Sequence, residues 1–149
     1  MSGLFIKKIF IFLLLAKCTI TFGQNSNAII DLGINMQQKG NHFEAHQLFQ
    51  KAINLDSTSA RIHFYYGLNM IHLHRYNKAS WHLEKVLKKD ASGKKFPEAS
   101  YFLGEMKKHQ RKYNEAILLF KKTKAHYVHD QQSYYYKKAN REINSSIYA

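Results

Sequence analysis

The chain has 149 residues, and its 23 Lys and Arg residues outnumber 10 Asp and Glu residues, for a formal net charge of +13. A single Pro and seven Gly exclude a loop-rich chain and argue against an all-β fold, because such chains need many turn residues. Ten Tyr and ten Phe supply apolar bulk for the core of one domain. The basic balance suggests an anionic partner such as nucleic acid, depending on the compartment.

The first 23 residues have the pattern of a secretory signal peptide. Lys7 and Lys8 form a positive start, residues 9–16 form an uninterrupted apolar run, and residues 21–23 place small side chains for cleavage before Gln24. The apolar run is too short to cross the ~30 Å hydrocarbon core of a membrane. We therefore expect residues 1–23 to be removed on export, and not to anchor the protein in a membrane.

Cys18 is the only cysteine, and the stretch Leu15-Ala16-Lys17-Cys18 raises the alternative of a lipoprotein. Lys17 stands where a lipidation signal needs a small residue, which favours the cleaved peptide. Cleavage after Gly23 leaves a chain without cysteine, so we expect neither a disulfide nor thiol chemistry. The cleaved chain keeps 20 Lys and Arg and 10 Asp and Glu, a net charge of +10.

The rest of the chain predicts seven helices joined by short polar turns. Gly40 and Asp56 mark the turns around the second helix, residues 57–59 cap the third, and Pro97 stands in the first turn of the fifth. The expected helices are residues 28–39, one helix within 40–57, then 60–73, 76–89, 97–110, 113–125 and 130–147.

The last of these helices has no partner in the sequence. We expect its apolar stripe to face the core and its polar side to face solvent, as the end of a repeat array requires. The stripe is Tyr136, Ala139, Ile143 and Ile147, and the outward side chains are Lys137, Lys138, Arg141 and Glu142.

Small and large residues recur at fixed spacing in three consecutive units. The period is 34 residues between the first two units and 37 before the third, where a polar loop at 90–95 holds the extra residues. Small residues are needed where two helices of a hairpin cross closely, and a large residue is expected to fill the gap between neighbouring repeats. The small residues are Gly33, Gly67, Gly104, Ala45, Ala79 and Ala116, and the large ones are Phe49, Leu83 and Phe120.

With this spacing the chain resembles the tetratricopeptide repeat (TPR) family over residues 26–125. The resemblance implies an all-α, right-handed TPR solenoid of three helical hairpins and a C-terminal capping helix. Within a domain at 24–149, the repeats fall at about 26–59, 60–93 and 97–130, and the capping helix at about 130–147. Five residues depart from the family pattern, and we expect them to cause local repacking. Ile29, His63 and Ser100 replace an aromatic residue, and Val86 and Thr123 replace an alanine.

Three segments in the C-terminal half give a narrower resemblance. Residues 96–104 (FPEASYFLG), 113–117 (YNEAI) and 137–143 (KKANREI) are similar to the N-terminal TPR unit of Bacteroidota envelope proteins, some of which serve type IX secretion. In those proteins a β-propeller and a peptidoglycan-binding OmpA-like domain follow. This sequence contains no OmpA-like segment, so the resemblance implies an envelope location without peptidoglycan binding.

TPR arrays bind peptides in a concave groove lined by the first helix of each hairpin, and exposed aromatic side chains there are good anchors. For each candidate the alternative is packing against the facing helix. Asp31, Ile34 and Glu105 stand where a receptor for C-terminal carboxylates needs Lys, Arg or Asn, which excludes that class. The candidates are Ile30, Asp31, Ile34 and Gln37 in the first unit, Arg61, Phe64, Tyr65, Leu68 and His72 in the second, and Tyr101, Phe102, Glu105 and His109 in the third.

The sequence predicts no metal, no cofactor and no enzyme. His42 with His46, and His72 with His74, are closely spaced pairs, but neither has an evident third ligand for zinc. No nucleophile has an obvious base, and no glycine-rich loop is present to bind phosphate.

Basic pairs cluster in the C-terminal half, and they are Lys88-Lys89, Lys94-Lys95, Lys107-Lys108, Arg111-Lys112, Lys121-Lys122 and Lys137-Lys138. In an exported protein they favour an acidic protein or an anionic outer-membrane surface, with a solvated helix face as the alternative. Nucleic-acid binding would require that the chain stays in the cytosol. Ser57 lies in a short O-glycosylation-like motif, residues 56–58.

We therefore predict an exported, non-catalytic TPR adaptor of the bacterial cell envelope, in the periplasm and associated with the outer membrane. Its expected partner is another envelope protein or a peptide segment of one, and not nucleic acid. The alternative is a structural subunit or tether of an outer-membrane or secretion complex that binds through its basic C-terminal half.

Overall fold

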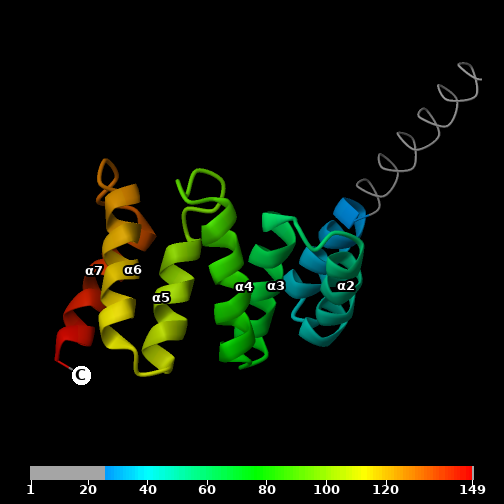
Figure 1. Cartoon of the computed structure of the whole chain (residues 1–149), viewed down its shortest axis with the longest axis horizontal. Coiled ribbons are helices and arrows are strands. Elements are labelled where there is room, and N and C mark those ends of the chain that lie inside the picture. Colours follow the sequence, from blue (N-terminus) through cyan, green and yellow to red (C-terminus); the bar gives the residue numbers. More distant parts are fainter. Residues whose placement is uncertain (1–25, 149) are drawn as a thin grey trace, which may run out of the picture. The chain divides into compact units, whose positions relative to one another are not determined.

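The computed structural model describes residues 26–148, which form seven helices and their turns and no strand (Figure 1). The predicted signal peptide and Cys18 lie outside the described residues. The all-α class is confirmed. The chain divides after Thr58 into two compact units, Met1–Thr58 and Ser59–Ala149, which are taken one at a time. Among the described helices, none has the length and apolar composition that a membrane crossing requires.

The first unit is one helical hairpin, made of the helix over residues 26–38 and α2 (His42–Leu55). A Cβ atom on Gly33 would lie 2.8 Å from the Phe49 ring, so the two helices approach each other closely where the glycine stands. Phe49 is fully buried, as are Ala45 and Ala52 on the same face of α2. The small and large residues that recur in the sequence therefore form the core of this hairpin.

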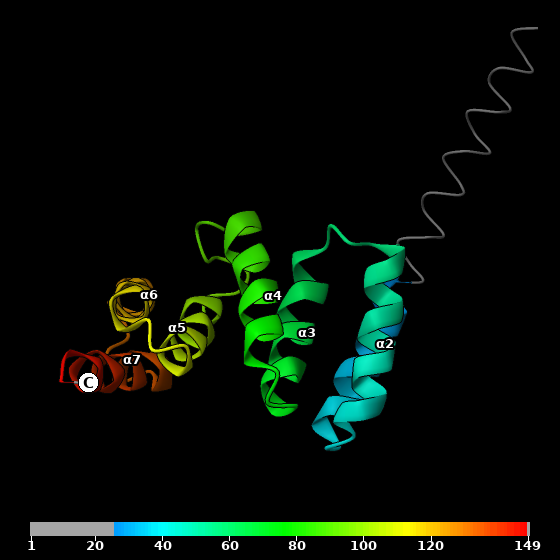
Figure 2. The ribbon, with the colours of Figure 1, turned by 60° about the horizontal axis from the view of Figure 1, so that its bottom comes forward.

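The second unit holds two hairpins and a final helix. The helix α3 packs on α4, α4 packs on α5, and α6 packs on both α5 and α7 (Figure 2). The bounds are Ala60–His72 for α3, Tyr76–Lys89 for α4, Ala99–His109 for α5, Tyr113–His126 for α6 and Tyr134–Ile147 for α7. The core of this unit is built from the facing sides of these helices.

The glycines of the second unit also lie at helix crossings. A Cβ on Gly67 would lie 3.2 Å from Leu83, and one on Gly104 would lie 2.6 Å from Phe120. The sequence predicts that these large residues fill gaps between neighbouring repeats. In the structure each one also lies against the glycine of its own hairpin, where the missing side chain leaves room for it, and Phe120 shares a buried cluster with Ala139 of α7.

The three hairpin turns share one backbone geometry. A residue with positive φ ends each first helix: Gly40 (φ 81°), His74 (φ 55°) and Arg111 (φ 60°). The amide that follows donates back across the turn in each case, from Asn41 to Met36 O, from Arg75 to Met70 O and from Lys112 to Lys107 O, at 2.8–2.9 Å. This left-handed cap satisfies the last carbonyls of the helix. The sequence indicates the geometry only at Gly40, because His and Arg do not signal a positive φ.

Two helices begin later than predicted. The helix α5 begins at Ala99 and not at Pro97, because residues 97–98 form a turn closed by a 3.1 Å bond from the Ala99 amide to Phe96 O. The helix α7 begins at Tyr134 and not at Asp130, because the Ser133 hydroxyl accepts from the Tyr136 amide and caps the helix there.

The buried side of α7 differs from the predicted one. Tyr135, Ala139, Ile143 and Ser146 face inward, whereas Ile147 is 59% exposed. The predicted stripe is therefore wrong at Ile147, whereas Tyr136 is half-buried like Tyr135. Glu142, expected to point outward, pairs with Lys108 of α5.

Three departures from the family pattern, His63, Ser100 and Thr123, have a polar partner in the facing helix. The Ser100 and Thr123 hydroxyls lie 2.8 Å apart, and the Nδ1 atoms of His63 and His82 lie 3.0 Å apart; all four residues are buried. A buried polar group is costly without a hydrogen bond. The predicted repacking thus takes the form of hydrogen-bonded pairs between the two helices of a hairpin.

Candidate functional site

The main candidate site is a groove within the second unit, on the side formed by the first helix of each hairpin. Its cavity measures about 450 Å³. Side chains from α3, α5 and α7 line it, together with His74 from the turn after α3 and Tyr76 from the start of α4. The lining residues are Ile71, His72, His74, Tyr76, Tyr101, Phe102, Glu105, Met106, His109 and Tyr134. We call this the α3–α5–α7 groove.

Five of the predicted groove residues line this cavity, and they are His72, Tyr101, Phe102, Glu105 and His109. Tyr101 forms the floor, since it is only 6% exposed and its ring lies 5.8 Å from the ring of Phe120 in α6. Burial raises the pKa of the Tyr101 hydroxyl well above its usual value, and the nearby Glu105 charge adds to the rise. Tyr101 therefore stays neutral throughout the physiological range.

The other candidates on α3 do not line the cavity, and they are Arg61, Phe64, Tyr65 and Leu68. Phe64 is buried and packs its ring 4.9 Å from Phe96 and 6.4 Å from Phe102. The Arg61 guanidinium lies 5.9 Å from the centre of the Tyr65 ring. For Phe64 the structure thus favours the packing alternative over a direct role in binding.

The candidates in the first unit lie in a separate body. Ile30 is fully buried, Ile34 and Gln37 are half-buried, and Asp31 is exposed. Ser57 is also exposed, in the turn after α2. The neighbouring Asp56 carboxylate accepts from the Thr58 amide and hydroxyl at 2.8 and 2.7 Å. The O-glycosylation site at Ser57 stays a prediction.

Sequence reasoning missed half of the groove lining, which is Ile71, His74, Tyr76, Met106 and Tyr134. Ile71 lies next to the predicted His72 on the groove side of α3. Tyr134 is 62% exposed and belongs to α7, a helix expected only to cap the array. The alternation of first and second helices is the signal that identifies it, because α7 occupies the place of a first helix.

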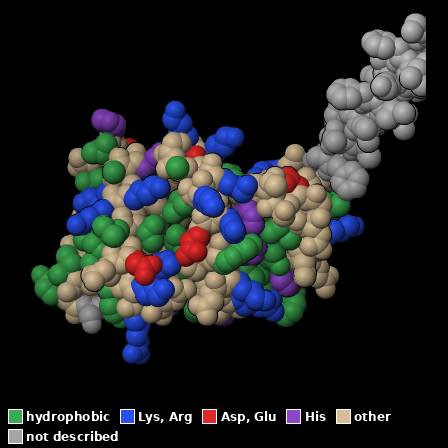
Figure 3. Space-filling view, in the orientation of Figure 1, with side chains coloured by type: hydrophobic (Ala, Val, Ile, Leu, Met, Phe, Trp, Pro, Cys, Tyr) green, Lys and Arg blue, Asp and Glu red, His purple; other side chains and the backbone are tan. Residues whose placement is uncertain are grey.

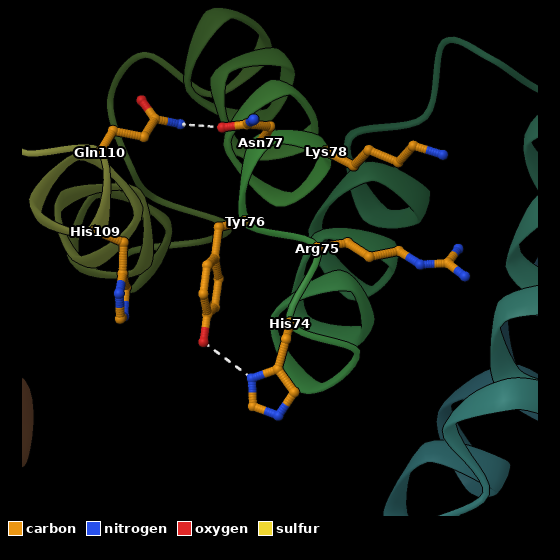
Figure 4. A pocket seen from close by; sticks show the side chains of 7 residues that line it. All are labelled: His74, Arg75, Tyr76, Asn77, Lys78, His109 and Gln110. Atoms are coloured by element: carbon orange, nitrogen blue, oxygen red, sulfur yellow. Dashed lines mark hydrogen bonds between the residues drawn. The ribbon is translucent and has the colours of Figure 1, made fainter.

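A second cavity of about 460 Å³ adjoins the groove and shares His74, Tyr76 and His109 with it (Figure 4). The rings of Tyr76 and His109 stack at 4.3 Å with an angle of 7° between them. His74 Nδ1 lies 2.9 Å from the Tyr76 hydroxyl. The Tyr76 ring is therefore held from two sides, and it forms a fixed wall between the two cavities.

Glu105 is the only carboxylate among the residues that line the groove, and none of them is Lys or Arg. Its Oε1 atom is buried and has no hydrogen-bond partner among the described residues. Burial raises the pKa of this carboxyl, and the charge of Glu142 adds to the rise, whereas Lys108 and Lys138 lower it by less. The groove is thus aromatic and weakly acidic, although the rest of the unit is basic.

The basic side chains gather elsewhere, on the ends of α4 and α6 and on the loop after α4. Figure 3 shows Lys and Arg side chains over these parts. We define the lysine edge as Lys88, Lys89, Lys94, Lys95, Lys121 and Lys122. Among the described residues, none of these six has an ion-pair partner. By contrast, Lys107 lies 2.8 Å from Glu84 and 3.0 Å from Glu115, and so ties α4, α5 and α6 together.

Asp90 shapes the loop that carries part of the lysine edge. Its carboxylate accepts from the Lys95 and Phe96 amides at 2.9 Å each and from the Ser92 hydroxyl at 3.2 Å. Burial alone would raise the pKa of Asp90, but the hydrogen bonds from Phe96, Lys95 and Ser92 outweigh it, so the pKa lies below its usual value. The Asp90 carboxylate, which lies between Lys89 and Lys94 in the sequence, is thus occupied largely by the backbone.

The histidines do not gather into a metal site in the part of the chain that the structure describes. No group of three or more His, Cys, Asp or Glu side chains there has the geometry to hold an ion. His72 and His74 both line the α3–α5–α7 groove. They contribute imidazole rings to its lining.

The same arrangement of helices occurs in solved structures of other proteins. The type III secretion translocator chaperone SycD of Yersinia enterocolitica matches with a TM-score of 0.73 and 16% identity, covering 80% of this chain and 81% of that one. PcrH in complex with the chaperone-binding region of PopD matches with a TM-score of 0.71 and 19% identity, covering 81% of this chain and 90% of that one. The first TPR domain of RPAP3, bound to an HSP90 peptide, matches with a TM-score of 0.72 and 13% identity, covering 85% of this chain and 95% of that one.

No protein-family model matches the sequence, and no curated protein matches it either. The likeness to solved structures extends over about four-fifths of the chain at low identity. It agrees with the periodic glycines, the close helix crossings and the repeated turns described above. The chain therefore has the TPR fold.

Proposed function

We propose that the protein is an exported, non-catalytic TPR adaptor that holds a segment of another cell-envelope protein in the α3–α5–α7 groove. The groove itself is the observation that carries the proposal. It combines a buried aromatic floor, an exposed aromatic residue and several imidazole rings in a cavity of about 450 Å³. Aromatic anchors in a concave site are a common basis of peptide recognition.

Proteins of the same fold support a peptide or protein segment as the occupant. RPAP3 was solved with an HSP90 peptide, PcrH with a region of PopD, and SycD with a peptide of YopD. These proteins share the fold and differ from this chain in most residues. They support a peptide or protein segment as the class of partner, but they do not identify the partner of this chain.

The envelope location in this proposal rests on residues 1–23 and on the resemblance of residues 96–143 to Bacteroidota envelope proteins. It is tested by isolating the native protein from cells and determining its first residue. Export with cleavage predicts Gln24 as that residue. A chain that keeps residues 1–23 and stays in the cytosol would exclude the envelope and would favour nucleic acid as the partner.

The groove is tested by crosslinking in cells. A photoreactive amino acid is placed at Tyr134, which is 62% exposed in the groove, or at Leu118 of α6, which is 67% exposed and outside it. We expect one protein species to be crosslinked at position 134 and not at 118. The same products at both positions, or none at either, would contradict binding in the groove.

A second function is favoured by the lysine edge, where six lysines have no ion-pair partner among the described residues. In this alternative the protein is a tether or structural subunit that contacts an anionic outer-membrane surface. Each lysine near such a surface contributes about 1 kcal/mol at most. The expected result is binding of the mature chain to phosphatidylglycerol vesicles.

Charge-reversed variants test this alternative. Replacing Lys88, Lys89, Lys121 and Lys122 with Glu should abolish vesicle binding. The matched control carries the same change at Lys39, Lys51, Lys78 and Lys137, which are exposed and outside the lysine edge. An equal loss of vesicle binding in both variants would show that only the net charge matters. If the native protein sediments with membranes even in high salt, a stable contact with a membrane complex is favoured over ionic adsorption.

A further inference from the structure

The inference concerns Glu105, and it rests on the proposed function of the α3–α5–α7 groove. An ionised carboxylate in a partly apolar site is costly unless a donor or a cation compensates it. Glu105 lies on α5 between the aromatic residues Tyr101 and Phe102 and the thioether of Met106, all of which line the groove. In the part of the chain that the structure describes, its buried Oε1 atom has no hydrogen-bond partner. The groove therefore contains an acceptor that the folded chain leaves unused.

The nearby lysines are occupied by other groups. The Lys108 ammonium donates to the Glu142 carboxylate, and it also donates to the Ser145 hydroxyl at 2.9 Å. The Lys138 ammonium lies 5.6 Å from the centre of the Tyr134 ring. Both lower the pKa of Glu105 from a distance, but burial and Glu142 together outweigh them. No cation among residues 26–148 is thus in direct contact with the carboxylate.

The walls around Glu105 suit a cation with an alkyl stem. Tyr101 and Phe102 form an edge-to-face pair at 5.6 Å, and Tyr134 stands 62% exposed at the rim of the same groove. Aromatic faces attract ammonium and guanidinium groups, and they also pack against the methylene groups of Lys and Arg. A neutral donor would satisfy the oxygen, but only a cation would gain from both the carboxylate and the rings.

We propose that the α3–α5–α7 groove selects a partner segment that carries a Lys or Arg side chain, which pairs with Glu105 between the aromatic walls. The selection is local. Residues 59–149 hold 18 Lys and Arg and 7 Asp and Glu, so the unit as a whole repels cations over long distances. A basic side chain therefore gains from this groove only at close range.

The test uses an array of short peptides on which the mature chain is incubated. Each sequence occurs in four versions that differ at one central position, which is Lys, norleucine, Gln or Glu. Norleucine keeps the length and apolar character of the Lys stem and lacks its charge. Among sequences that bind, the Lys version should bind about tenfold more tightly than the norleucine version, as a charged hydrogen bond with a cation–π contact predicts.

Glu105→Gln keeps the shape of the side chain and removes its charge, so it should reduce the preference for Lys to about twofold or less. Asp130→Asn is the matched control, because Asp130 is exposed and does not line the groove. The control should keep the preference. A second measurement is the NMR titration of the Glu105 carboxyl, whose pKa should fall when a Lys peptide binds.

The outcomes separate the two proposals. Peptides that bind without a preference for Lys, or with a preference that Glu105→Gln leaves intact, would overturn the role of Glu105 and leave the groove as a peptide site. An array without any binding would overturn the proposed function together with this inference. Circular dichroism checks whether the Glu105→Gln variant is folded. If it is not, the NMR titration of the wild-type protein tests the role of Glu105, because an unchanged Glu105 pKa on binding of a Lys peptide would overturn it.

Discussion

The α3–α5–α7 groove and the lysine edge lie in the same unit and differ in almost every respect. The groove is made of rings and imidazoles on the first helices, and its single charge is negative. The lysine edge is made of six cations on the ends of the second helices and on the loop between α4 and α5. The comparison shows that the first and second helices of a repeat can carry opposite chemistry, because only their facing sides are needed for the core.

The largest expected effect concerns the support of the groove. Gly104→Ala places a methyl group 2.6 Å from the buried Phe120 ring, so α5 and α6 must move apart. We expect a loss of about 2–4 kcal/mol in the free energy of unfolding, from denaturant titration. Gly67→Ala, where the nearest atom is Leu83 Cγ at 3.2 Å, should cost about 1 kcal/mol.

A second substitution sharpens this test. Phe120→Leu in the Gly104→Ala background recreates the pairing that Gly67 and Leu83 show, with a smaller side chain opposite the new methyl group. Part of the lost stability should return, and a double-mutant cycle measures the coupling. Additive losses in the double variant would contradict the close contact.

The second expected effect concerns the loop that carries Lys94 and Lys95 of the lysine edge. Asp90→Ala removes the acceptor of the Lys95 and Phe96 amides and should cost about 1–3 kcal/mol. The same bond makes stability depend on pH. The folded-state pKa of Asp90 is lowered, so its contribution is present above the unfolded pKa of about 3.9 and is lost as the pH falls further, through the folded pKa.

Acid titration of the wild type and of the Asp90→Asn variant checks this prediction by the midpoint of unfolding. The variant should lose stability at neutral pH and show a smaller further loss below pH ~4. Equal acid sensitivity of the two proteins would show that other carboxyl groups carry the pH dependence. The lysine edge should also lose its vesicle binding in Asp90→Ala if the fold of the loop is what aligns Lys94 and Lys95.

The third expected effect is confined to binding in the groove. Tyr134 is 62% exposed, so Tyr134→Ala should change stability by less than about 0.5 kcal/mol. Loss of an aromatic anchor should weaken peptide binding by about 1–2 kcal/mol, as fluorescence anisotropy can measure. Vesicle binding should stay unchanged. A parallel loss of vesicle binding would show that the two surfaces are not independent.

The smallest expected effect leaves both surfaces intact. Arg111 has φ 60° at the end of α5, a conformation that costs about 1–2 kcal/mol for residues with a Cβ. Arg111→Gly should therefore raise stability by about 0.5–1 kcal/mol. Gly40→Ala, at the same place in the first hairpin (φ 81°), should lower it by a similar amount, and thermal unfolding compares the two.

The fold was predictable because its signal is repeated. The glycines at 33, 67 and 104 each require a large neighbour, and three copies of one pattern leave little ambiguity about hairpins. The start of α7 was not predictable to within a turn, because both Asp130 and Ser133 are good caps and only the structure shows that Ser133 is used.

The groove was predictable in part. The resemblance to TPR arrays predicted His72, Tyr101 and Glu105 on the groove side, and the structure brings them together. Periodicity does not decide whether an aromatic residue packs or stays exposed, and so Phe64 was assigned to the groove although it is buried against Phe96. Tyr134 was missed for the opposite reason, since a helix at the end of an array was treated only as a cover.

The repeated turn has a consequence for how the chain folds. Each turn is closed by backbone bonds within six residues, and the core of each hairpin joins residues close in the sequence. Contacts of this kind form quickly, since little chain entropy is lost before they are made. The hairpins can then act as separate starting points, so that refolding of this chain should be rapid and should begin in more than one place.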